Sequence, residues 1–120
     1  AVLSRRPMQE VVARPFCDMG DSRHIAVDVE GSSGKSVRIH NFYIPAGGDE
    51  PDPAINPKFE HKLRFLDEMI AWFGADTPTV APADGAVILG DLNIAPLEED
   101  VWSHKKLLKV VSHTPVETEG

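Results

Sequence analysis

The segment "VILGDLNIAP", residues 87–96, follows an apolar run with a carboxylate and an amide at alternate positions. In an extended chain alternate residues share a face, so Asp91 and Asn93 are predicted to point into one cleft. Asp91 can accept a proton from a water molecule, Asn93 can donate a hydrogen bond to an anionic oxygen, and Gly90 leaves room for a substrate. The alternative is an Asx turn, in which both side chains only bind loop amides.

A second segment, "HNFYIPAGG" at residues 40–48, has the same character. It places Asn41 and Tyr43 on one face of a strand, directly before a glycine loop. A tyrosine hydroxyl at a strand end can donate a hydrogen bond to a phosphoryl oxygen, although an aromatic ring can also simply fill the rim of a core. Because ligand sites collect at the carboxyl ends of strands, we expect the two segments to share one cleft.

Period-two alternation of apolar residues predicts the strands that carry these segments. Strands are expected over residues 1–5, 10–16, 23–31 and 36–45, with Pro7 in the first turn and a Gly- and Ser-rich hairpin loop over residues 31–35. Consecutive strands separated by short loops indicate a meander, so at least three neighbouring antiparallel strands are expected to come first.

Residues 57–73 are predicted to form a helix, because Pro57 suits a first turn and Gly74 suits a helix end. Residues 75–85 are expected to be loop, and residues 86–90, "AVILG", a strand buried on both faces. The order strand, helix, strand predicts a sheet covered by a helix. One stripe of the helix is expected in the core and another in water: Phe59, Leu63, Leu66, Ile70 and Phe73, against Glu60, Lys62, Arg64 and Asp67.

Composition narrows the classes of function. A chain of 120 residues with 42% hydrophobic residues suits one globular domain, and no apolar run approaches the roughly 20 residues of a membrane span. The single cysteine, Cys17, favours a reducing cytoplasm, and no membrane partner is expected. A net charge of −7 weighs weakly against nucleic acid as a partner, but Lys105, Lys106 and Lys109 make a local basic patch.

The two segments, in this order and separated by this helix, closely resemble the exodeoxyribonuclease III family of the endonuclease/exonuclease/phosphatase superfamily. The motifs that carry the resemblance are Asn-x-Tyr-x-Pro at residues 41–45 and Gly-Asp-x-Asn-x-x-Pro at residues 90–96. The resemblance extends over most of the chain. It implies an α/β fold that is part of a four-layered α/β sandwich, with two packed mixed β-sheets and helices on the outside.

The resemblance also implies an activity. Members of the family cleave DNA at abasic sites and remove nucleotides from 3′ ends, with Mg²⁺ or Mn²⁺ as cofactor. By this analogy Asp91 orients or deprotonates the attacking water, Asn93 holds the scissile phosphate, and Tyr43 stabilises its negative charge. Asn41 supports the site, while Trp102, Lys105 and Lys106 fall where the family touches double-stranded DNA, although Trp102 can also simply pack.

Other parts of the family pattern are missing from these 120 residues. The chief metal-binding glutamate, the asparagine before it and the closing Ser-Asp-His motif have no counterpart, and the five histidines lack metal-ligand spacing, so the metal ligands stay unknown. We therefore expect residues 1–120 to be the central portion of a single domain, inactive alone. Half of a two-sheet sandwich leaves an apolar face uncovered, so the fragment is expected to self-associate, to swap elements or to require the missing segments.

Two further hypotheses remain open at this point. The chain can come from a phosphoesterase of the same superfamily that acts on a lipid or a small molecule, which the acidic net charge allows. It can also be a non-catalytic interaction domain that keeps the scaffold without the metal site. The basic residues beside Trp102 favour DNA over the first of these alternatives.

Overall fold

The computed structural model describes residues 1–74 and 83–119. They form two compact units: Ala1–Tyr43 with Met69–Asp91, called here the first unit, and Ile44–Glu68 with Leu92–Gly120, called the second unit. The strands are β1 (Met8–Val12), β2 (His24–Glu30), β3 (Ser36–Tyr43) and β4 (Gly85–Asp91). The helices are α1 (Pro57–Phe73), the 3₁₀ turn η1 (Glu98–Asp100), α2 (His104–Leu107) and α3 (Pro115–Thr118).

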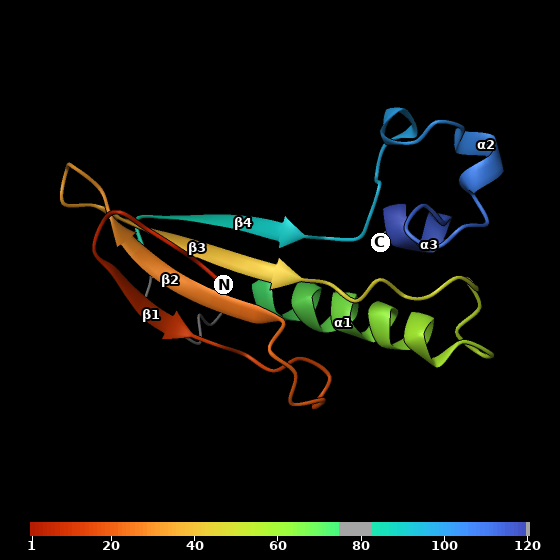
Figure 1. The fold of residues 1–120 in the computed structure, drawn as a ribbon, viewed down its shortest axis with the longest axis horizontal. Coiled ribbons are helices and arrows are strands. Elements are labelled where there is room, and N and C mark those ends of the chain that lie inside the picture. Colours follow the sequence, from red (N-terminus) through yellow and green to blue (C-terminus); the bar gives the residue numbers. More distant parts are fainter. Residues whose placement is uncertain (75–82, 120) are drawn as a thin grey trace. The chain divides into compact units, whose positions relative to one another are not determined.

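The first unit is built on one mixed sheet with the strand order β1-β2-β3-β4 (Figure 1). The first three strands form the predicted antiparallel meander, and β4 then pairs in parallel with β3. The expected strand over residues 1–5 is wrong, since the first strand begins only at Met8, after Pro7, which has no N–H to donate to a ladder. The mixed α/β fold is thus confirmed in this part of the chain.

The more buried face of this sheet carries two histidines. His24 and Ala26 of β2 pair with Phe42 and His40 of β3, so all four side chains lie on the same face. All four are buried, and Phe73 packs edge-on against His40 at a centroid distance of 5.1 Å. The opposite face carries the valines and isoleucines of β2 and β3, of which Val27 is buried and Val37 is exposed.

Strand β4 is exposed along its whole length, which contradicts the prediction of a strand buried on both faces. Val87, Ile88 and Leu89 retain 46%, 44% and 42% of their accessible surface. The reason is position in the sheet: β4 is the last strand in the order, and its packed neighbour among the described residues is β3. An apolar run therefore identified the strand correctly but did not show what covers it.

Helix α1 has the predicted bounds, and its first part belongs to the second unit. Its buried residues are Phe59, Lys62 and Phe65, three residues apart, whereas Ile70 of the predicted core stripe is exposed. The expectation that Lys62 faces water is wrong, because this side chain is fully buried and ion-paired with Glu117.

Two other expectations concern less regular parts of the chain. The loop expected over residues 75–85 lies mostly outside the described residues, and Gly85 already belongs to β4. In the described part of the chain, α1 is the longest helix, and neither it nor any other helix has the length and apolar character needed to cross a membrane.

Candidate active site

Tyr43 and Asp91 are the last residues of two adjacent strands. In the parallel pairing of β3 with β4, Tyr43 lies opposite Asp91, and Asn41 lies opposite Leu89. Paired residues of neighbouring strands project from the same face, so the phenol and the carboxylate stand side by side at the carboxyl end of the sheet. Both residues are exposed. The sequence had predicted this meeting of the two strand ends.

Gly90 brings the two strands together directly before Asp91. Its φ is +134°, and a Cβ atom placed on it would lie 1.9 Å from the carbonyl oxygen of Phe42. No side chain fits at that distance, so only glycine allows β4 this close to β3 here. The glycine was expected to leave room for a substrate; within the first unit, the main chain of Phe42 is what requires the missing side chain.

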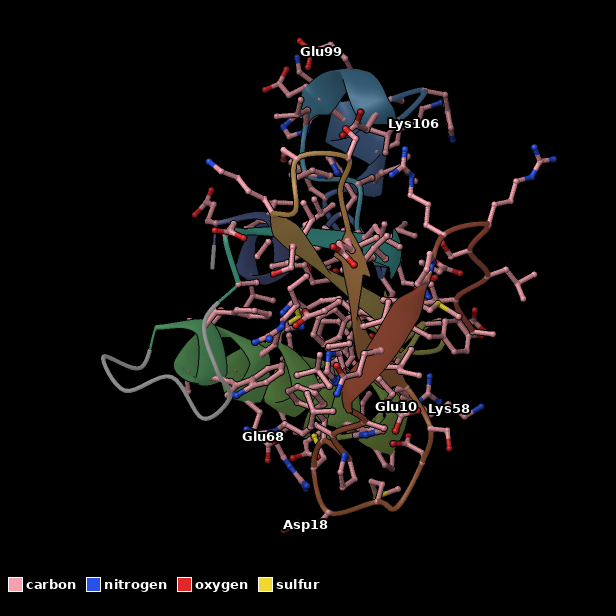
Figure 2. The ribbon with its side chains drawn as sticks, turned by 90° about the vertical axis from the view of Figure 1, so that its left-hand side faces the viewer. Glu10, Asp18, Lys58, Glu68, Glu99 and Lys106 are labelled. Atoms are coloured by element: carbon pink, nitrogen blue, oxygen red, sulfur yellow. The ribbon has the colours of Figure 1, made fainter. Side chains whose placement is uncertain are left out.

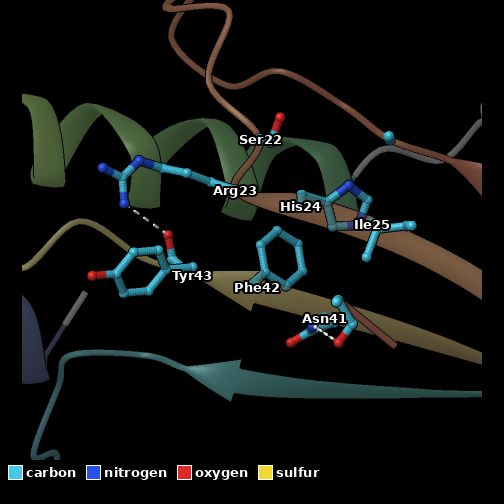
Figure 3. A pocket seen from close by; sticks show the side chains of 9 residues that line it. Ser22, Arg23, His24, Ile25, Asn41, Phe42 and Tyr43 are labelled. Carbon is cyan, nitrogen blue, oxygen red and sulfur yellow. Dashed lines mark hydrogen bonds between the residues drawn. The ribbon is translucent and has the colours of Figure 1, made fainter. Parts of the chain in front are cut away.

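The backbone of Tyr43 and its ring both contact Arg23 (Figure 3). The Tyr43 N–H donates to the Arg23 carbonyl at 2.8 Å, and Arg23 Nη1 donates to the Tyr43 carbonyl at 3.3 Å. The guanidinium carbon lies 5.0 Å from the centre of the phenol ring, a cation–π contact, and Arg23 Nε is paired with Asp21 at 2.5 Å. A fixed positive charge therefore lies beside Tyr43.

Sequence reasoning missed Arg23, because nothing in its neighbours distinguishes it from any arginine that precedes a strand. Arg23, Asn41 and Tyr43 all line a pocket with a volume of about 310 Å³. Asn41 donates from Nδ2 to the carbonyl oxygen of Ala1 at 3.0 Å, so its amide is bound to the N-terminal residue. The supporting role expected for Asn41 stays a prediction.

Asn93 does not continue the extended strand. Strand β4 ends at Asp91, and Asn93 has a φ of +50°, so the alternation that grouped the two side chains does not apply to it. Asparagine tolerates this left-handed conformation better than most residues. Within the second unit its Nδ2 donates to the carbonyl oxygen of Ile44 at 2.8 Å, and its own carbonyl oxygen accepts from Lys62 Nζ at 2.7 Å.

The second unit also carries the residues predicted to touch DNA. Trp102 is 76% exposed, and Lys106 Nζ lies 5.0 Å from the centre of its ring. Lys105 is exposed as well. The acidic turn η1, which includes the exposed Glu99, directly precedes the basic helix α2 in the sequence. Figure 2 labels Glu99 and Lys106. Exposure on this scale excludes ordinary core packing for Trp102 within the described residues.

Four of the five histidines form two pairs. In the first unit His24 Nε2 lies 3.1 Å from His40 Nδ1, and in the second unit His104 Nδ1 lies 2.9 Å from His113 Nε2. Burial, reinforced by the charges of His40 and Arg14, lowers the pKa of His24 to about 4. Among residues 1–74 and 83–119, no group of three or more His, Cys, Asp or Glu side chains could hold a metal ion.

A complete Mg²⁺ or Mn²⁺ site therefore does not fit the described residues. Asp91 supplies one carboxylate at the candidate site, and hard divalent cations need several oxygen ligands. Any further ligands would come from protein groups other than those described, from water or from a substrate phosphate.

No protein-family model matches the chain, and no curated protein matches it. Solved structures do. A 3′ phosphatase, NExo, from Neisseria, bound to a product DNA hairpin, is 25% identical with a TM-score of 0.74 and covers 97% of this chain. An AP endonuclease from Archaeoglobus fulgidus is 22% identical with a TM-score of 0.70 and covers 97%. The 3′–5′ exonuclease NExo from Neisseria meningitidis is 25% identical with a TM-score of 0.56 and covers 95%.

These structural neighbours are exonuclease III-like members of the endonuclease/exonuclease/phosphatase superfamily, which confirms the resemblance drawn from the two motifs. The mixed sheet and the helices of this chain are similar to the nuclease fold. The chain spans about two-fifths of the length of the neighbours, 41% of the first two and 40% of the third.

Proposed function

We propose that these 120 residues are the central portion of one domain of a DNA-repair nuclease of this superfamily. The complete protein then hydrolyses phosphodiesters at abasic sites and at 3′ ends, with Mg²⁺ or Mn²⁺ as cofactor and a second sheet completing a four-layered sandwich. One observation carries the proposal: Tyr43 and Asp91 stand opposite each other at the carboxyl ends of adjacent parallel strands, in a fold similar to that of nucleases.

The geometry suits attack of water on a phosphodiester. Asp91 accepts a proton from the water while the water oxygen forms a bond to phosphorus, and the bond from phosphorus to the leaving oxygen breaks. The leaving oxygen then takes up a proton from solvent. The Tyr43 hydroxyl donates a hydrogen bond to a non-bridging oxygen, where negative charge grows in the transition state. The Arg23 guanidinium, which is paired with Asp21, lies against the Tyr43 ring.

Asn93, Trp102 and the two lysines take the remaining roles in this proposal. Asn93, whose side-chain amide donates to the carbonyl oxygen of Ile44 at 2.8 Å, is assigned to holding the scissile phosphate. The exposed Trp102 ring stacks on a base or sugar, and Lys105 and Lys106 neutralise phosphates of double-stranded DNA.

The test is cleavage of a labelled duplex that carries one abasic site. We would compare residues 1–120 with the complete polypeptide, each with Mg²⁺ and with a chelator. The complete polypeptide is expected to cut and the 120 residues alone are not. Light scattering on the same samples checks whether the shorter chain self-associates, as the exposed apolar side chains of β4 lead us to expect.

Substitutions in the complete polypeptide sharpen the test. Asp91→Asn should lower kcat by about 10²- to 10⁴-fold, because the amide cannot take a proton from water. Asp84→Asn is the matched control: this carboxylate, just before the opposite end of β4, accepts from the Ser36 N–H at 2.8 Å, which an amide oxygen can also do. Its kcat should stay within about two-fold of the wild type, the scale of an uninvolved surface substitution.

The outcomes also separate the rival hypotheses. If the complete polypeptide leaves DNA intact but hydrolyses a small phosphoester in an Asp91-dependent reaction, the substrate is not DNA. If it binds the duplex without hydrolysing any phosphoester, the protein is an interaction domain and the nuclease proposal is refuted.

A further inference from the structure

A lysine ammonium group is buried in the second unit. Lys62 has no exposed surface, and its Nζ lies 2.5 Å from Glu117 Oε1. Nζ also donates to the carbonyl oxygen of Asn93 at 2.7 Å, with longer contacts of 3.4 Å to the carbonyl oxygen of Ala46 and to Ser112 Oγ. An ammonium group has three hydrogens, and the two short contacts identify Glu117 and Asn93 as its main acceptors.

The carboxylate on the other side of the pair is equally enclosed. The Glu117 side chain has no exposed surface and accepts from the main-chain N–H of Ser112 at 2.9 Å and of Thr114 at 3.1 Å, and from Thr114 Oγ1 at 2.6 Å. Both charges are therefore desolvated but fully hydrogen-bonded, the condition under which a buried ion pair is tolerated.

The backbone makes room for this lysine. Gly47 has a φ of +91°, and a Cβ atom on it would lie 2.9 Å from Lys62 Cδ and 2.9 Å from Val111 Cγ1. Lys62 itself occupies the middle of an apolar row of α1, three residues after Phe59 and three before Phe65, both fully buried. An apolar residue would fill that position without any charge to desolvate, so packing alone does not explain a lysine there.

Main-chain carbonyl groups do explain it. The left-handed Asn93 presents its carbonyl oxygen to the helix instead of to a strand, and Lys62 supplies the hydrogen-bond donor. The side-chain amide of Asn93 donates to the carbonyl oxygen of Ile44. Two hydrogen bonds, one to the main chain and one from the amide, thus fix both the backbone and the rotamer of Asn93.

We propose that Lys62, kept in place by Glu117, is a positioning residue that fixes Asn93 for its contact with the scissile phosphate. This inference rests on the proposed function, because it gives Asn93 a role in hydrolysis. A displacement of about 1 Å in a group that orients the substrate can cost about 10²-fold in rate. Loss of a group that orients a ligand-binding residue typically costs about 10- to 100-fold.

The decisive variants remove both charges at once. Lys62→Met alone leaves Glu117 buried and unpaired, so a fall in activity could reflect misfolding. In the complete polypeptide, Lys62→Met is combined with Glu117→Gln, whose amide oxygen can still accept from the buried N–H groups of Ser112 and Thr114. This double variant should recover most of the Tm lost in the single variant, yet kcat should stay about 10- to 100-fold below the wild type with KM within about two-fold. If kcat recovers together with Tm, the ion pair is only structural and the proposal is wrong.

A double-mutant cycle tests whether Lys62 acts through Asn93. If it does, the charge-free variant (Lys62→Met with Glu117→Gln) should lose little further kcat when Asn93→Ala is added, because residues that act as a unit are non-additive. Independent roles would instead multiply the two fold losses, and that result would overturn the proposal.

A measurement without substrate keeps the inference separate from the nuclease function. If the wild-type protein cleaves no substrate, the proposed function has failed, and positioning is read from the side-chain amide resonances of Asn93 by NMR. The charge-free variant should shift these resonances and leave those of Asn41, an amide of the first unit that is bound to the carbonyl oxygen of Ala1, unchanged. Unchanged Asn93 resonances would refute the positioning role on their own.

Discussion

Acid should destabilise the first unit, because His24 and His40 are buried there as neutral rings. The main-chain N–H of Arg14 donates to His24 Nδ1 at 3.3 Å, which places the His24 proton on Nε2, from which it donates to His40 Nδ1 at 3.1 Å. A second proton on either ring would break one of these bonds. Burial, then the charges of His40 and Arg14, lowers the pKa of His24 to about 4, and burial also lowers that of His40, against the opposing effect of Asp28.

The sign and size follow from proton linkage. With a pKa of about 4 in the folded state and 6.5 in the unfolded state, the unfolded chain binds more protons between these values, so stability falls as the pH falls from 6.5 towards 4. For His24 alone this loss of unfolding free energy amounts to about 2 kcal/mol at pH 5 and about 3 kcal/mol at pH 4. The lowered pKa of His40 acts in the same direction.

The assay is urea unfolding of the complete polypeptide at several pH values between 7 and 4, with wild type and His24→Gln. The variant should lose stability less steeply with falling pH, by about 2 kcal/mol over the interval from pH 7 to pH 5. If His24→Gln does not fold, an NMR titration of the wild-type imidazole replaces it. Parallel stability curves, or a His24 ring that titrates near 6.5, would refute the reasoning.

Two further predictions test the strand ends and the basic residues. Gly90→Ala should lower the unfolding free energy by about 3 kcal/mol or more in a denaturant melt, because its Cβ would overlap the Phe42 carbonyl; Gly85→Ala, which meets no atom within 4 Å, should change it by about 0.5 kcal/mol or less. Lys106→Ala should reduce the slope of log Kd for DNA against log salt by about one, and a reduction of equal size in the exposed Lys58→Ala would contradict a specific role for Lys106.

The elements of the fold were predictable where local signals determine them. Pro57 and Gly74 mark the ends of a helix by their own backbone preferences, and α1 has the predicted bounds. That the ends of these two strands meet was also predicted, because ligand sites collect at the carboxyl ends of strands; the register, in which Tyr43 pairs with Asp91, came only with the structure.

Long-range partners decided the features that were not predictable. By its spacing, Lys62 belongs to the charged stripe of α1 that was expected to face water. The groups that make its burial possible, Glu117 and the carbonyl of Asn93, lie 55 and 31 residues further along the chain. The His24–His40 pair replaces apolar residues in the core face because each ring satisfies the other. Asn93 adopts a positive φ that neither its type nor its spacing requires. No periodicity in the sequence encodes the Lys62–Glu117 pair, the His24–His40 pair or the positive φ of Asn93.

The parallel pairing of β3 with β4 has a consequence for the order in which the protein folds. The meander of β1, β2 and β3 closes through short connections, whereas the contact between Ser36 and Asp84, at the start of β3 and β4, joins residues 48 apart in the chain. Such non-local contacts carry a larger loop-closure entropy and generally form later. We therefore expect Tyr43 and Asp91 to come together late in folding and to separate early on local unfolding, so that amide protons of β4 exchange with solvent before those of β2; the reverse order would exclude this sequence of events.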